Sequence, residues 1–124
     1  MEPNGNHTDI TIKNINGRTV LGPVASLTFK NCDQMEKIFN DLLKRDVVDI
    51  IVDMKQVPFM DSRALELLVE MQTQLDKRGT DLMISHLNDV CQDILICVRL
   101  QDRFKIISSP GTKNRSSNFN TLVK

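Results

Sequence analysis

Ser62 carries the hydroxyl group in this sequence that is best suited to covalent modification. It lies between Asp61 and Arg63. A serine can accept a phosphoryl group from a kinase, which adds about −1.5 to −2 charges. Phe59 and Met60 precede this group, and two apolar side chains are unusual in a loop, which is normally polar. An apolar patch beside a hydroxyl is suited to docking a partner that phosphorylation would repel.

The sequence does not favour a serine or cysteine as an enzyme nucleophile. It contains no G-x-S-x-G turn, no Gly-rich phosphate loop and no Cys/His pair at usable spacing. A purely structural role also stays open for the serine. In that interpretation Asp61 caps a helix and Ser62 is simply its first residue.

Asp53 is a second residue that could accept a phosphoryl group. The stretch 49–66 (DIIVDMKQVPFMDSRALE) superficially resembles a response-regulator receiver, in which an aspartate at the end of a central strand is phosphorylated. That reaction needs Mg²⁺ held by carboxylates after the first strand, and a lysine after the last. Here the first expected strand ends in residues 13–15 (KNI) and the last in residues 106–109 (IISS). Both required partners are missing, so the receiver is kept only as an alternative.

Metal and disulfide chemistry find little support in the residue spacing. Cys32, Cys91 and Cys97 are odd in number and match no disulfide framework or zinc pattern. The last two would lie about 240° apart around one helix. His7 and His86 have no second ligand at usable spacing. We expect no metal and no cofactor, and a reducing cytoplasm as the location.

Length and charge limit the classes of protein that the chain can belong to. It has 124 residues, with 16 Lys+Arg against 16 Asp+Glu, and 40% of its residues are hydrophobic. This length suffices for one domain with its own core. The balanced charge argues against a dedicated nucleic-acid binder. No apolar run approaches the length of a membrane span, so no membrane insertion is expected.

Apolar periodicity and turn residues predict the elements that must position Ser62. Residues 9–13 and 19–26 read as two strands joined by a hairpin at Asn16-Gly17. A helix follows, opened by Asn31 and Gln34 as a capping box, with its apolar repeat at Met35, Ile38, Phe39, Leu42 and Leu43.

The second half of the chain alternates strands and helices. Residues 49–54 form an apolar run typical of a strand covered on both faces. The helix after Ser62 ends at Gly79, the next strand spans 82–85, Asn88 caps a further helix, and 104–107 is the last strand. This order predicts an α/β fold: a single domain with a mixed β-sheet, opened by an antiparallel hairpin and packed by amphipathic helices.

Three segments are expected along the chain. Residues 1–8 form a flexible N-terminus and 9–107 the folded domain. Residues 108–124 are rich in Ser and Asn, with three cations and no acid, so this tail is expected to be disordered and solvated.

One family shares the pattern of the central segment. The run 49–71 (DIIVDMKQVPFMDSRALELLVEM) resembles the signature of the STAS domain, named for sulfate transporters and anti-sigma-factor antagonists: a strand ending in Asp, an apolar-x-Asp-Ser turn and a Leu-rich helix. Asn16-Gly17-Arg18 followed by Gly22 is similar to the family's first hairpin. Residues 90–104 are similar to its last helix and the start of its final strand.

The resemblance implies a function for the Asp-Ser pair. In stand-alone bacterial members, a serine kinase of the histidine-kinase fold, which also sequesters a sigma factor, phosphorylates this serine, and a PP2C-type phosphatase removes the phosphate. By the resemblance, Ser62 is the phosphoacceptor and Asp61 the adjacent acid. Unmodified protein would bind the kinase and modified protein release it. The chain itself would catalyse nothing.

The same resemblance suggests which residues meet the partner. They are Phe59, Met60, Asp61 and Arg63 around the serine, and Pro23 and Val24, which follow Gly22 of the second strand. Arg63 stands where the family usually has a small residue, and an arginine can pair with a phosphate or help to select a kinase. The main alternative is an accessory or scaffold subunit of a larger assembly, such as a stressosome or a lipid-transport complex, in which Ser62 only helps to cap a helix.

Overall fold

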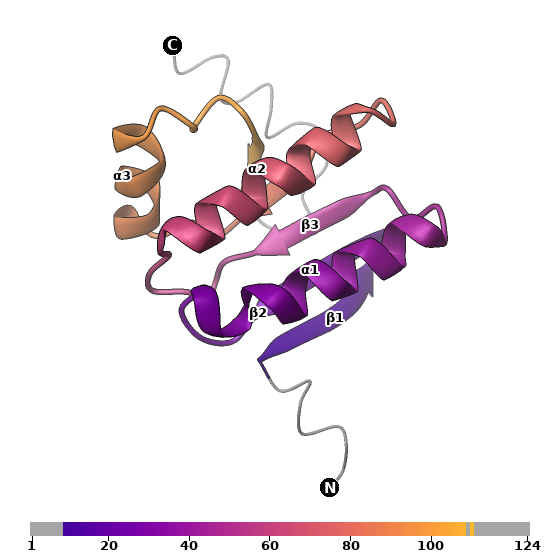
Figure 1. Ribbon diagram of the computed structural model, residues 1–124, viewed down its shortest axis with the longest axis horizontal. Helices are drawn as coiled ribbons and strands as arrows, with labels where there is room; N and C mark the ends of the chain where they lie inside the picture. Colours follow the sequence, from indigo (N-terminus) through magenta and orange to yellow (C-terminus); the bar gives the residue numbers. More distant parts are fainter. Residues whose placement is uncertain (1–8, 109, 111–124) are drawn as a thin grey trace, which may run out of the picture.

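The computed structural model of the chain describes residues 9–108 and residue 110. Five strands and three helices follow one another in the order predicted above (Figure 1). The strands are β1 (Ile10–Ile15), β2 (Arg18–Pro23), β3 (Ile50–Asp53), β4 (Met83–Ser85) and β5 (Lys105–Ile107). The helices are α1 (Phe29–Lys44), α2 (Ser62–Asp76) and α3 (Asp89–Cys97). The N-terminus predicted over 1–8, and all of the predicted tail except Ser108 and Pro110, lie outside the described residues.

The strands form one mixed sheet in the order β1-β2-β3-β4-β5. β1 and β2 are antiparallel, and the other neighbouring pairs are parallel. Asn16 and Gly17 both have positive φ, 54° and 83°, as a tight hairpin turn requires. The predicted mixed sheet with an opening hairpin is thus confirmed, although β2 ends at Pro23 and not at residue 26.

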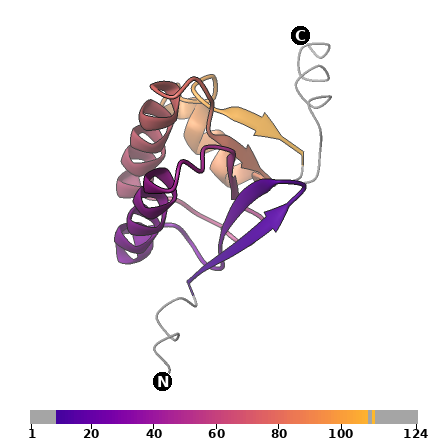
Figure 2. The same cartoon turned by 90° about the vertical axis from the view of Figure 1, so that its right-hand side faces the viewer.

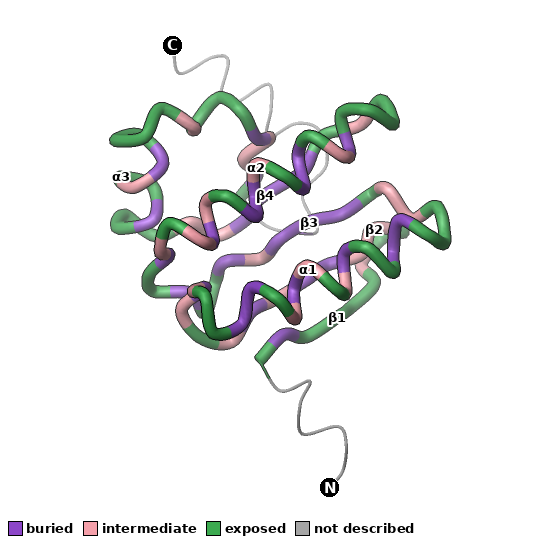
Figure 3. Tube along the Cα trace, viewed as in Figure 1, coloured by how far each residue is buried: buried purple, intermediate pink, exposed green. Residues whose placement is uncertain are grey.

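Helices α1 and α2 lie side by side across one face of the sheet (Figures 1 and 2). Their buried residues recur along the side that faces the strands, and their exposed residues along the other (Figure 3). The core between helices and sheet includes Leu21, Ile50, Val52, Met35, Phe39, Leu67, Met71 and Leu75. A smaller apolar cluster of Val20, Ile51, Met83 and Ile107 occupies the other face. The loops after β3 and β4 therefore begin at strands that have apolar packing on both faces of the sheet.

The start of α1 differs from the sequence prediction. The helix begins at Phe29, and its N-cap is Thr28, whose Oγ1 accepts a hydrogen bond from Lys30 N at 3.2 Å. Asn31 completes this capping box by accepting from Thr28 N at 2.9 Å, so the predicted box of Asn31 with Gln34 is wrong. Asn31 is only 5% exposed and also donates to Ser26 O, which fixes it as the third helical residue rather than the cap.

A buried glutamine ties α2 to the start of β4. Gln72 is 4% exposed, and its Oε1 accepts a hydrogen bond from Leu82 N at 2.8 Å. Its Nε2 donates to Asp81 Oδ1 at 3.2 Å. The side chain thus supplies the acceptor for a buried backbone N–H. It helps to set where α2, and with it Ser62, lies on the sheet.

We expect Gln72→Leu to lower the free energy of unfolding by about 1–3 kcal/mol, because it leaves the N–H of Leu82 buried without its acceptor. Urea denaturation monitored by circular dichroism measures the loss. Gln74→Leu, at a half-buried position of the same helix, is the matched control and should change stability much less. Equal losses in the two variants would contradict this role of Gln72.

Candidate functional site

The loops that precede α1 and α2 are joined by backbone hydrogen bonds. Leu27 N donates to Phe59 O at 3.0 Å, and Asp61 N donates to Leu27 O at 3.2 Å. Leu27 also forms an isolated parallel bridge with Met60. Both apolar side chains are buried, at 0% and 2% exposure. The loop after β2 and the loop after β3 therefore act as one surface, although they are far apart in the sequence.

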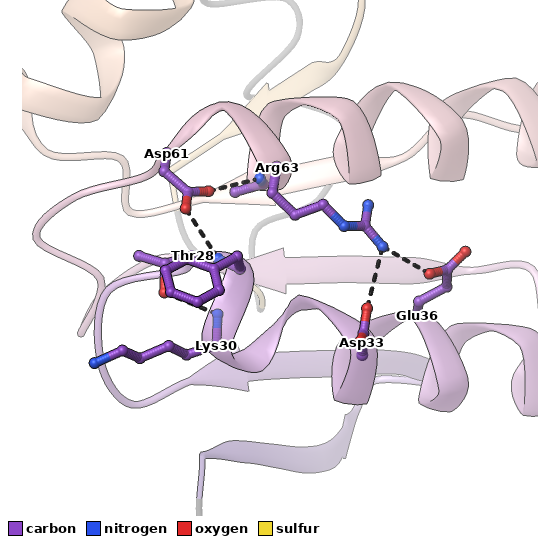
Figure 4. Close-up of polar contacts among 8 residues, drawn as sticks. Thr28, Lys30, Asp33, Glu36, Asp61 and Arg63 are labelled. Carbon is purple, nitrogen blue, oxygen red and sulfur yellow. Dashed lines mark hydrogen bonds and ion pairs between the residues drawn. The ribbon is translucent and has the colours of Figure 1, made fainter.

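Asp61 caps the starts of both helices. Its Oδ1 accepts from Ala64 N of α2 at 3.0 Å, and its Oδ2 accepts from Phe29 N of α1 at 2.9 Å (Figure 4). The prediction of Asp61 as the N-cap of α2 is confirmed. The hydrogen bond from Asp61 to the start of α1 was not predicted from the sequence. A carboxylate satisfies such orphan N–H groups and complements the positive end of a helix.

These contacts change the acidity of Asp61. Partial burial raises the pKa of the carboxyl, but hydrogen bonds from the backbone N–H groups of Ala64 and Phe29 lower it further than burial raises it. The net pKa lies below the ordinary value of an aspartate. Asp61 is therefore a fixed negative charge at neutral pH.

Ser62 is the first residue of α2 and is exposed, as predicted. The capping role in this turn belongs to the side chain of Asp61, and Ser62 is the first helical residue, as the purely structural interpretation also expects. Ser62 also lines a largely apolar hollow of about 440 Å³, whose other lining residues are Leu65, Glu66, Val69, Glu70, Val98 and Leu100. The hydroxyl group thus lies where another protein can reach it.

Arg63 is held by α1. Its Nη2 lies 2.9 Å from Glu36 Oε1 and 3.4 Å from Asp33 Oδ1, and the side chain extends along α1 away from Asp61 (Figure 4). The ion pair with Glu36 joins the two helices just beyond their shared cap. In this arrangement the guanidinium is engaged by two carboxylates and is not placed as the partner of a phosphate on Ser62.

Two phenylalanines form the exposed apolar part of the site. Phe59 is 47% exposed, as expected, and Phe29 is 67% exposed. Both line a hollow of about 790 Å³ between the two loops, together with Val24, Pro58 and Asp61. Sequence reasoning missed Phe29 because it placed the start of α1 at Asn31, which left this aromatic residue in a loop outside the apolar repeat.

Two predicted contact residues are corrected by their burial. Met60 is 2% exposed and packs in the core, because its bridge to Leu27 turns it inward. Pro23, the last residue of β2, is also buried, whereas Val24 is half-buried at the hollow. The exposed apolar surface next to Asp61 is therefore built from Phe29 and Phe59 rather than from Phe59 and Met60, and Ser62 lines the neighbouring hollow with Leu65.

Asp53 ends β3, as the receiver-like alternative requires, but it takes part in other contacts. Its Oδ1 lies 2.8 Å from His86 Nδ1 and accepts from Lys55 N at 3.1 Å. Among the described residues, no group of three His, Cys, Asp or Glu side chains is placed to hold a metal ion.

The cysteines do not contribute a reactive thiol to the core. Cys32 and Cys91 are buried, and Cys97 is exposed. Burial raises the pKa of the Cys32 thiol to about 11 and also raises the pKa of Cys91. Since the thiolate is the nucleophile, these two groups are unreactive at neutral pH.

We expect Asp61→Ala to lower the free energy of unfolding by at least about 1 kcal/mol, because a single cap contributes roughly 0.5–2 kcal/mol and this carboxylate serves two helices. Asp61→Asn should lose less, since an amide oxygen can still accept. Urea titrations at neutral pH measure both. Asp41→Asn, which changes an exposed carboxylate of α1, is the control.

The contribution of Asp61 should also depend on pH. Its pKa is lowered by folding, so its stabilisation is present above the unfolded value of about 3.9 and is lost as the pH falls through the lower folded value. We expect the stability gap between the wild type and Asp61→Asn to be full at pH 7 and to shrink below about pH 4. A gap that stays constant down to pH 2 would show that the carboxylate charge is not what matters.

Comparison with known proteins places the chain in a family. No curated protein matches it in sequence. A candidate anti-sigma-factor antagonist of Thermotoga maritima, TM1081, is 18% identical, with a TM-score of 0.78 over 98% of this chain and 99% of that one. The anti-sigma-factor antagonist SpoIIAA of Bacillus is similar in its unphosphorylated form, with 13% identity, a TM-score of 0.65 and coverage of 91% and 97%.

SpoIIAA in its phosphorylated form gives a TM-score of 0.66 at 12% identity, over 90% of this chain and 98% of that one. At such identities these structures show a common fold. The family model of the STAS domain matches residues 9–112, which includes both helix-capping loops and Ser62. The chain therefore belongs to the STAS domain family.

Proposed function

We propose that this chain is a phosphorylation-switched binding protein, an anti-sigma-factor antagonist. With Ser62 unmodified, it binds a serine kinase of the histidine-kinase fold that also serves as an anti-sigma factor. With a phosphate on Ser62 it releases that partner, and a PP2C-type phosphatase restores the unmodified form. The observation that supports this most directly is the exposed Ser62 at the start of α2, between a capping carboxylate and an apolar surface.

The described geometry lets the host tolerate a phosphate at this position. The added charge of about −1.5 to −2 would lie in the first turn of α2, where the partial positive charge of the helix end favours an anion. Ser62 is exposed, so the phosphate stays in water in the free protein. The fold should therefore survive modification.

The same charge would act strongly against a bound partner. A protein that covers the start of α2 together with Phe29 and Phe59 would have to desolvate the phosphate next to the ionised Asp61. Juxtaposed charges of this kind cost several kcal/mol at an interface. A loss of about 3–4 kcal/mol corresponds to a 100- to 1,000-fold lower affinity.

Arg63 supports this one-sided effect. An arginine beside the phosphoacceptor can neutralise a phosphate, but this guanidinium is bound to Glu36 and Asp33 of α1. A phosphate on Ser62 would thus keep its charge toward the partner. We infer that Arg63 contributes to the site by holding α2 against α1.

In this proposal the chain has no catalytic activity of its own, because phosphoryl transfer and its reversal belong to the kinase and the phosphatase. Its partners are proteins and not nucleic acid, which is consistent with 16 cations against 16 anions. The proposed location is the cytoplasm, where such a kinase and a sigma factor meet. No helix in the described part of the chain is both long enough and apolar enough to cross a membrane.

We expect Ser62→Ala to keep the partner and Ser62→Glu to lose it. Each variant is used as bait in native lysate, with and without Mg-ATP, and mass spectrometry identifies the bound protein and any phosphate on the Ser62 peptide. The kinase-type partner should be retained by Ser62→Ala and depleted at least about tenfold with Ser62→Glu. Wild-type protein should lose it when ATP is present.

Stability measurements separate this switch from unfolding. The melting temperatures of both Ser62 variants should lie within about 3 °C of the wild type, since an exposed helix-start residue contributes little. Equal capture by all three forms would rule out the switch and favour an accessory or scaffold subunit. Phosphate on Asp53 that requires Mg²⁺ would instead favour the receiver-like alternative.

The two phenylalanines should carry much of the affinity for the partner. We expect the double change Phe29→Ser and Phe59→Ser to weaken binding of the captured kinase by about tenfold or more, because both rings are exposed apolar contacts. Ile96→Ser on α3, where the side chain is 51% exposed, is the matched control and should bind normally. Isothermal titration calorimetry measures both. If the control loses as much affinity as the double variant, the docking surface lies elsewhere.

A further inference from the structure

A third hollow lies on the face of the sheet opposite α1 and α2, at the end where β3 and β4 finish. Its volume is about 450 Å³, within the range of small-molecule sites. The lining residues are Thr11, Lys13, Ile15, Val20, Gly22, Pro23, Asp53, Lys55, Gln56, His86 and Pro110.

His86 has a strained backbone at this hollow. Four non-glycine residues of the described chain have positive φ. Asn16 lies in the hairpin turn, and Asp46 and Arg99 each follow a helix C-cap, where this conformation is common. His86, with φ of 57°, follows β4 instead. Such strain persists only where the surrounding structure enforces it, and it concentrates at functional sites.

Asp53 holds the strained histidine in place. Asp53 Oδ1 lies 2.8 Å from His86 Nδ1 and also accepts from Lys55 N at 3.1 Å and Ser85 Oγ at 3.3 Å. These contacts offset the charge of the carboxylate and fix which ring nitrogen is engaged. Nε2 is then the remaining polar atom of an imidazole that lines the hollow.

Two of the other polar residues in the lining, Lys13 and Lys55, carry positive charge. Lys13 and Lys55 bring two ammonium groups from β1 and from the loop after β3, and Gln56 adds an amide. Asp53 is the one carboxylate among the described lining residues. Lysine ammonium groups bind phosphate as point charges that approach its oxygens from several directions. An apolar wall of Val20, Ile15, Pro23 and Pro110 completes the hollow and suits an organic group attached to the anion.

We propose that this hollow binds a small organic phosphate monoester. Lys13, Lys55 and His86 contact the phosphate, Asp53 orients His86, and the apolar wall packs against the organic part. The site is separate from Ser62, and it does not depend on the switch proposed above. Gln56 lines both this hollow and the one between Phe29 and Phe59.

The first test is an NMR titration of the full chain labelled with ¹⁵N, using three probes. Phenyl phosphate has the phosphate and an apolar ring, inorganic phosphate lacks the ring, and benzoate replaces the phosphate by a carboxylate. Phenyl phosphate should give saturable shifts at the amides of Lys55, Gln56 and His86, with an affinity at least about tenfold above that of benzoate. Inorganic phosphate should bind at the same amides more weakly.

Two variants connect those shifts to the named side chains. The double change Lys13→Ala and Lys55→Ala should weaken phenyl phosphate about tenfold or more, since it removes two charged donors. Lys37→Ala with Lys77→Ala removes the same charge from exposed positions of the helical side and is the matched control. His86→Asn should keep the fold, because asparagine tolerates positive φ, and should also weaken binding.

Several outcomes would overturn the site. One is the absence of saturable shifts up to about 10 mM phenyl phosphate. Others are an equal loss of affinity in the two lysine double variants, or shifts centred on Ser62 and the start of α2. Benzoate binding as tightly as phenyl phosphate would reject the phosphate class. Binding to lipid is tested by sedimentation with phosphatidylcholine vesicles that contain or lack phosphatidic acid. If the protein sediments only with phosphatidic acid and shows no saturable binding of phenyl phosphate, the lysines bind a lipid headgroup instead. None of these assays contains a kinase or ATP, so their failure leaves the Ser62 switch untouched.

Discussion

A single carboxylate that caps two helices is the contact on which the site depends. Asp61 accepts hydrogen bonds from the first N–H group of α1 and from the N–H of Ala64 in the first turn of α2, while its own backbone N–H is bonded to the loop before α1. Helix ends need such acceptors because their first N–H groups have no partner within the helix. This shared carboxylate links the start of α2, where Ser62 lies, to Phe29 at the start of α1.

This arrangement separates the tasks of three consecutive residues. Asp61 stabilises the helix starts, Ser62 faces water, and Arg63 turns back to the acids of α1. A charge added to the middle residue is favourable to the helix and unfavourable to whatever covers it. The proposed switch requires this asymmetry, because a phosphorylated form must remain folded in order to be restored.

The two faces of the sheet offer different chemistry. The helical face ends in a surface with two exposed phenylalanines, whereas the opposite face ends in lysines around the Asp53–His86 pair. Residues 54–61 connect the two regions, and Gln56 borders both hollows. The two hollows also meet at the end of β2, where Pro23 lines one and Val24 lines the other.

Local patterns in the sequence determined the element order, the Asn-Gly hairpin, the cap at Asp61 and the exposure of Ser62, because each depends on residues only a few positions apart. Tertiary structure alone decided that Met60 is buried against Leu27, that Phe29 joins Phe59 at the surface, and that Arg63 binds Glu36. The strained His86 and its bond to Asp53 belong to the same group. Each of these depends on two residues about 30 positions apart that meet only when strands and helices have packed, and periodicity along one segment carries no information about such a meeting.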